Sequence, residues 1–174
     1  MQKSLFRWEL IGVLFVVILG SVLHFVYHWS GQSPSAALIA PVNESVWEHL
    51  KLLFVPSLFY GIVEYFAIGR KISGFVFTKF VGMGIGLVTI MALFYIYTGI
   101  VGGNYLWANI GTFVAGAAVS FGFTVKRMPL LSDARTDLVG VVLFLILIVI
   151  FILATFFPPH IALFLDPVTL TYGL

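Results

Sequence analysis

Apolar residues gather in five long stretches of the chain, and short segments between them hold most of the charged and turn-forming residues. A helix that crosses the hydrocarbon core of a bilayer needs about 20 mainly apolar residues. Five stretches reach this length, at 8–30, 50–68, 78–101, 104–125 and 137–157. We therefore expect an all-α, polytopic membrane bundle with five transmembrane helices.

The segments between these stretches are too short to fold as separate domains, and no internal repeat is evident. Residues 1–174 are thus predicted to form a single transmembrane domain. The last segment, 158–174, is rich in apolar residues, whereas disordered tails are polar and charged. We expect it to be an ordered tail that folds back over the outer face of the bundle.

Composition supports this class of protein and excludes others. Of the 174 residues, 61% are apolar or aromatic and only 9% are charged, against about 25% charged in soluble domains. So few charges cannot cover a water-soluble enzyme, and they exclude a nucleic-acid-binding protein and a disordered chain. The absence of cysteine excludes disulfides and thiolate metal sites.

The basic residues predict how the bundle lies in the membrane. Eight of the nine Lys and Arg residues lie before the first stretch or around the 2–3 and 4–5 connections: Lys3, Arg7, Arg70, Lys71, Lys79, Lys126, Arg127 and Arg135. Only Lys51 falls at the opposite side. Because Lys and Arg are kept in cytoplasmic loops, we expect the N-terminus inside and the C-terminus outside.

Histidines and carboxylates gather at the predicted outer end. The residues that this topology brings there are His24, His28, His49, His160, Glu44, Glu48 and Asp166. Polar groups at membrane depth are costly, and they tend to pair, line a cavity or bind a ligand. This gathering is the main functional signal in the sequence.

His24 and His28 stand four residues apart, so both imidazoles lie on one helical face. That spacing is suited to chelating one metal ion, and zinc sites use two or three histidines with a carboxylate. We predict a metal site formed by His24 and His28 with His160 from the tail. The alternative is a histidine pair hydrogen-bonded to backbone or water at the headgroups.

The segment Pro41–His49 leads into the second stretch and contains a capping box, Ser45 with Glu48, with Asn43 as the alternative cap. On a helical wheel Glu44, Glu48 and Lys51 share a face, and His49 points about 100° or more away. We favour the Glu44 and Glu48 face, with Lys51 as counter-charge, and keep His49 as the competing metal ligand.

Three carboxylates, Glu44, Glu48 and Asp166, are candidates for a catalytic general base beside a metal-bound water. The alternative for Asp166 is a helix N-cap, because Pro167 follows it. Two further carboxylates lie in the spans. We expect Glu9 to pair with Arg7, and Glu64 to pair with Arg70 or Lys71 or to snorkel.

Two segments resemble a known family. The run PVNESVWEHLKL at Pro41–Leu52 and the ending LFLDPVTLTYG at Leu163–Gly173 resemble an uncharacterised family of small bacterial multi-pass membrane proteins. In residue types only, His24, His28, His160 and Asp166 are similar to the zinc site of alkaline ceramidases and adiponectin receptors, which have seven spans instead of five. This likeness implies a lipid-directed zinc hydrolase.

The leading hypothesis is therefore a zinc-dependent hydrolase in a bacterial cytoplasmic membrane, with membrane lipids around it and a lipid or amphiphile as substrate. The first alternative is a transporter or binding component for a small ligand or metal. The second is a non-catalytic accessory or immunity-type membrane protein. The sequence leaves the oligomeric state open.

Overall fold

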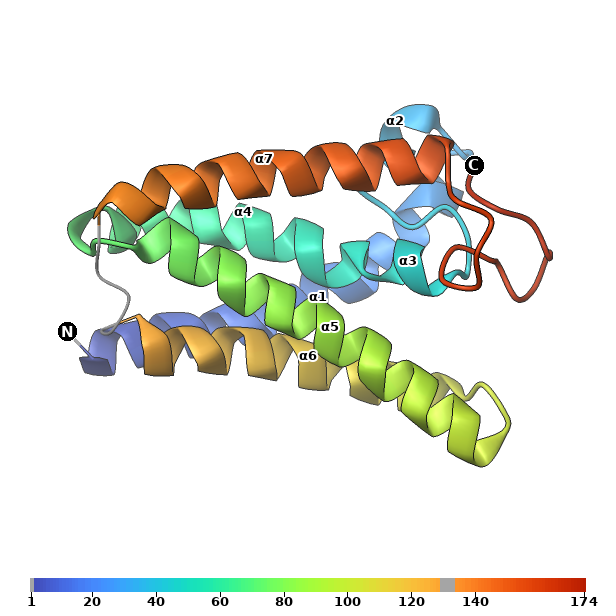
Figure 1. The fold of residues 1–174 in the computed structure, drawn as a ribbon, viewed down its shortest axis with the longest axis horizontal. Helices are drawn as coiled ribbons and strands as arrows, with labels where there is room; N and C mark the ends of the chain where they lie inside the picture. The colour runs from blue at the N-terminus through green and yellow to red at the C-terminus, as the bar shows by residue number, and fades with distance from the viewer. Residues whose placement is uncertain (1, 129–133) are drawn as a thin grey trace.

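Long helices run side by side in the computed structural model, which describes residues 2–128 and 134–174 (Figure 1). The long helices are α1 (Gln2–Trp29), α4 (Lys51–Ala67), α5 (Phe75–Val101), α6 (Leu106–Arg127) and α7 (Ala134–Phe156). The short ones are α2 (Pro34–Ala37), α3 (Val46–His49) and the 3-10 helix η1 (Gly69–Lys71). No strand occurs in the described ranges, where the only β-pairing is an isolated bridge between Leu165 and Tyr172.

Within those ranges, five helical segments are long and apolar enough to cross a membrane. They are Lys3–Trp29, Val46–Ala67, Phe75–Val101, Leu106–Arg127 and Thr136–Phe156, the second of which joins α3 to α4. The predicted all-α bundle of five spans is confirmed. By the length and composition of its helices the chain is a multi-pass membrane protein.

Small residues let α5 and α6 approach closely. A Cβ atom added to Gly86 on α5 would lie 2.8 Å from the carbonyl oxygen of Gly116 on α6, and one added to Gly82 would lie 2.7 Å from that of Ser120. Both distances are too short for a side chain. Gly82 and Gly86, which are four residues apart in the third stretch, therefore allow two helices of this bundle to pack closely.

Residues 157–174 fold across one end of the bundle, beside α2 and α3 (Figure 1). We call this end the tail end, and the opposite one, where α1 begins, the N-terminal end. The amide of Leu174 donates to the carbonyl of Thr155 at 3.0 Å, and the amide of Trp47 donates to that of Leu163 at 3.0 Å. The predicted return of the tail over the bundle is confirmed.

Candidate metal site at the tail end

The chain before α4 is shaped by two short side chains. Ser45 caps α3, because its hydroxyl accepts a hydrogen bond from the amide of Glu48 at 3.3 Å. Asn43 accepts from the amide of Ser45 at 3.0 Å and donates to the carbonyl of Gly173 at 3.0 Å. The predicted cap is confirmed, but Asn43, in place of Glu48, satisfies the amide of Ser45. The side chain of Glu48 is therefore free to turn inward.

Glu48 and Lys51 form a buried ion pair. Their side chains are 2% and 1% exposed, and Nζ lies 2.7 Å from Oε2. The ammonium also donates to the carbonyl oxygens of Ala37 at 2.8 Å and Ala40 at 3.3 Å. Lys51 thus ties the turn after α2 to the start of α4.

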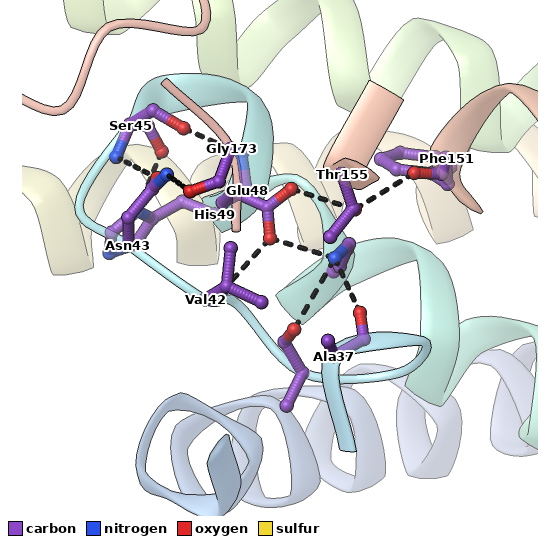
Figure 2. Close-up of polar contacts among 11 residues, drawn as sticks. Ala37, Val42, Asn43, Ser45, Glu48, His49, Phe151, Thr155 and Gly173 are labelled. Atoms are coloured by element: carbon purple, nitrogen blue, oxygen red, sulfur yellow. Dashed lines mark hydrogen bonds and ion pairs between the residues drawn. The ribbon is translucent and has the colours of Figure 1, made fainter. Parts of the chain in front are cut away.

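The remaining contacts of Glu48 are also internal, as Figure 2 shows. Oε2 accepts from the amide of Val42 at 3.0 Å, and Oε1 accepts from the hydroxyl of Thr155 on α7 at 2.9 Å. Together with Lys51, Glu48 joins α3, α4, α7 and the loop before them. Both oxygens are engaged, so in this structure Glu48 holds the tail end together.

A different set of side chains forms the candidate metal site. His24, Glu44 and His49 each offer a ligand atom, and these atoms all lie within 4.8 Å of one another. His24 comes from α1, Glu44 from the loop before α3, and His49 from the end of α3. A His/Glu group that could bind a metal is therefore present, and it contains His49, the competing ligand.

The contacts of His49 define the direction of its lone pair. Nδ1 lies 2.9 Å from the carbonyl oxygen of Ser45, which can only accept, so Nδ1 carries a proton. In the neutral ring Nε2 is then an acceptor. It lies 3.4 Å from Oε2 of Glu44, a second acceptor. Two acceptors that face each other in this way can share a cation, such as a metal ion, between them.

His24 supplies an unused nitrogen. Its Nδ1 is buried and has no hydrogen-bond partner, and its ring centroid lies 5.2 Å from that of His49. A half-open pocket of about 150 Å³ adjoins this ring. Its lining includes Tyr27, His28 and Glu44. The pocket gives an ion or water a path to His24 and Glu44.

The other predicted site residues lie outside the three-ligand group. His28 lines the same pocket but does not belong to the group. His160 stacks on Tyr172, with ring centroids 4.5 Å apart. Asp166 accepts from the amide of Val168 at 2.8 Å, and so caps a turn within the tail. The alternative that the sequence offered for Asp166 was a helix N-cap, but the residues after it form a turn and no helix.

The shared face of Glu44, Glu48 and Lys51 does not form. The wheel treats these residues as one helix, but the Ser45 cap starts α3 after Glu44. Glu44 therefore turns toward His49, and Glu48 alone pairs with Lys51. The sequence itself predicts this cap. A helix that begins after Ser45 contains Glu48 but not Glu44, so the two glutamates need not share a face.

Fold and site together define a multi-pass membrane protein with a His/Glu group suited to metal binding. The chain belongs to DUF6512, a family of unknown function, which matches residues 1–174. The expectation of an uncharacterised family is confirmed at this level. Searches of curated proteins and of solved structures gave no significant match.

Proposed function

We propose that this protein is a zinc-dependent hydrolase that acts on a lipid or amphiphile at the membrane surface. The observation that supports it is the pair of facing acceptors, Nε2 of His49 and Oε2 of Glu44, 3.4 Å apart. Ligands about 2.0–2.1 Å from a tetrahedral zinc ion are separated by about 3.3–3.4 Å. The pair thus already has the spacing of two zinc ligands.

His24 is the third ligand in this proposal. Its approach requires a small rotation, because the three ligand atoms now lie within 4.8 Å of one another. Two histidines and one glutamate leave the fourth position to water, as in catalytic zinc sites. Zinc lowers the pKa of such a water toward 7 and polarises a scissile carbonyl or phosphoryl group.

The general base in this proposal is His28, which lines the pocket one helical turn from His24. Of the three carboxylates predicted for that role, Glu48 and Asp166 have the internal contacts described above. Glu44 reaches the group and acts as a ligand. The proposal therefore rests on this geometry and does not use His160.

Apolar side chains beside the site support an amphiphilic substrate. Phe25 and Trp29 each follow one of the two histidines of α1 in the sequence. Both rings are exposed, and they stack with their centroids 5.6 Å apart. Large aromatic rings at the end of a spanning helix are typical of the membrane–water interface. A lipid headgroup at that level would meet the pocket directly.

The proposed location is a bacterial cytoplasmic membrane with the tail end outside. Supporting it, Lys3, Arg7, Arg70 and Lys71 all lie at the N-terminal end. An alkaline phosphatase reporter fused after Leu174 is expected to be active, whereas the same reporter fused after Lys71 should be inactive. The reverse result would overturn the orientation.

Lipid hydrolysis tests the activity. Untagged protein in vesicles of bacterial lipids should release a fatty acid or headgroup in a zinc-dependent manner, and a chelator should abolish the release. His49→Ala should lower the rate at least about 100-fold, because it removes a ligand of the zinc ion that would activate the attacking water. His160→Ala is the matched control, a histidine at the same end outside the group, and should retain activity. Release that persists with chelator would contradict the proposal.

A second candidate function, a binding or transport component, is favoured by one observation. A cavity of about 510 Å³ opens between α4, α5, α6 and α7 and is lined mainly by apolar side chains. Its size suits a small amphiphile. Zinc bound without turnover of any lipid would favour this candidate.

A further inference from the structure

Two glutamates share one lysine inside the bundle near the N-terminal end. Glu9 on α1 contacts Nζ of Lys79 on α5 through both carboxylate oxygens at 2.7 Å. Glu64 on α4 lies 2.5 Å from the same nitrogen. The sequence suggested Arg7 for Glu9 and Arg70 or Lys71 for Glu64. Those pairings are wrong, because Glu9 and Glu64 point into the bundle, where Lys79 meets them.

This triad is largely buried. The side chains of Glu9, Glu64 and Lys79 are 2%, 0% and 12% exposed. The ring of Phe121 on α6 covers the ammonium, with its centroid 4.7 Å from Nζ. In such a medium a charge without a partner is costly, and the charges within the triad must nearly balance.

With every group ionised, the triad carries a net charge of −1, because two carboxylates face one ammonium. Oε1 of Glu64 is buried and has no hydrogen-bond partner. Among the residues that the structure describes, the neighbouring polar groups supply no second cation. Tyr60 on α4 donates to the carbonyl of Trp8, and Asp137 on α7 accepts from the amide of Val76.

We propose that Glu9, Glu64 and Lys79 form an intramembrane binding site for one proton. The proton comes from hydronium, which leaves as water, and it forms an O–H bond on one of the two carboxylates. The other carboxylate and the ammonium stay ionised, so the net charge becomes zero. The unpartnered oxygen of Glu64 is the vacant acceptor in this arrangement.

The site has a route to a ligand. Lys79 lines the cavity of about 510 Å³, whereas neither glutamate does. Asp137 also lines the cavity. An anionic group that enters would pair with Lys79 and so change the charge that the glutamates must balance. The triad gives the bundle a means of coupling proton binding to occupation of the cavity, independently of the metal site at the other end.

Infrared spectroscopy of the protein in lipid nanodiscs tests the proposal, because it detects how many carboxyl groups are protonated in each variant. At neutral pH the wild type should show a protonated-carboxyl C=O band. Glu64→Gln should lose this band, because Glu9 and Lys79 then balance, and Glu9→Gln should lose it for the corresponding reason. Lys79→Gln should increase the band about twofold, since two carboxylates without a cation require two protons.

Glu44→Gln is the matched control, because Glu44 is half exposed at the opposite end, and it should leave the band unchanged. Circular dichroism checks that each variant is folded, and Glu9→Gln carries the test if Glu64→Gln does not fold. A wild type without the band, or a band that survives in either folded variant, would overturn the proposal.

Discussion

Lys51→Met is expected to lower the free energy of unfolding by about 3–5 kcal/mol, because it leaves the Glu48 carboxylate buried without its counter-charge. The carbonyl groups of Ala37 and Ala40 lose their donor at the same time. Methionine fills nearly the same volume, so the loss reports charge and hydrogen bonding more than packing. Denaturant unfolding in micelles, followed by circular dichroism, measures the change.

Two variants complete this test. Lys71→Met removes an exposed lysine at the N-terminal end and should change the unfolding free energy by less than about 0.5 kcal/mol. Adding Glu48→Gln to Lys51→Met removes the uncompensated charge and should restore part of the loss. If Lys51→Met unfolds like Lys71→Met, Glu48 and Lys51 do not hold the tail end together.

His24→Ala and His49→Ala are each expected to weaken zinc binding at least about 10-fold. Changing a group that only supports a metal ligand costs about 10–100-fold, and the loss of a ligand should cost no less. His160→Ala should leave the affinity unchanged, because its ring stacks on Tyr172. Competition with a fluorescent zinc chelator measures all three. Equal affinities in His49→Ala and His160→Ala would place zinc elsewhere.

Removal of the metal is expected to leave the packing of the tail unchanged. It is held by hydrogen bonds of Asn43 and Thr155, and by the ring of Trp47, which packs between Phe151 and Phe164. The sequence suggested that His160 ties the tail to the metal, and the structure gives these other contacts instead. Limited proteolysis should therefore cut the tail equally with and without chelator.

The fold was predictable because it follows from one strong signal. Long apolar runs must form helices in a bilayer, where each backbone amide and carbonyl needs a partner within its own segment. The tail was predictable for a related reason, since a segment with Phe164 and other apolar residues gains by packing on the bundle. Neither inference depends on how any helix is rotated.

The site depends on rotation and on loop paths, and the sequence carries little information about either. Glu9, Glu64 and Lys79 lie on three helices, and their meeting depends on how each helix turns about its axis. The partners of Lys51 include backbone carbonyls of Ala37 and Ala40, which no side-chain pattern marks. Spacing along the chain therefore favoured His28 as the partner of His24 in the metal site. The folded chain instead places His49 beside His24.

Most of the segment Pro41–Leu52 is explained by structure alone. Asn43, Ser45 and Glu48 shape the loop and join it to the tail. Glu44 has no such task, because it is half exposed and its described contact is with His49. His49 uses Nδ1 to bond the carbonyl of Ser45, but its Nε2, which faces Glu44, does not shape the loop. These two residues are where a function beyond folding has to be sought.

Zinc K-edge X-ray absorption on untagged protein, loaded with zinc and dialysed, tests the metal site most directly. We expect stoichiometric zinc with two imidazole nitrogens at about 2.0–2.1 Å, a carboxylate oxygen and water. His49→Ala should reduce the imidazole shell by half, and His160→Ala should leave the spectrum unchanged. Protein that stays folded but retains no zinc, or a spectrum that His49→Ala does not alter, would contradict a site at His24, Glu44 and His49.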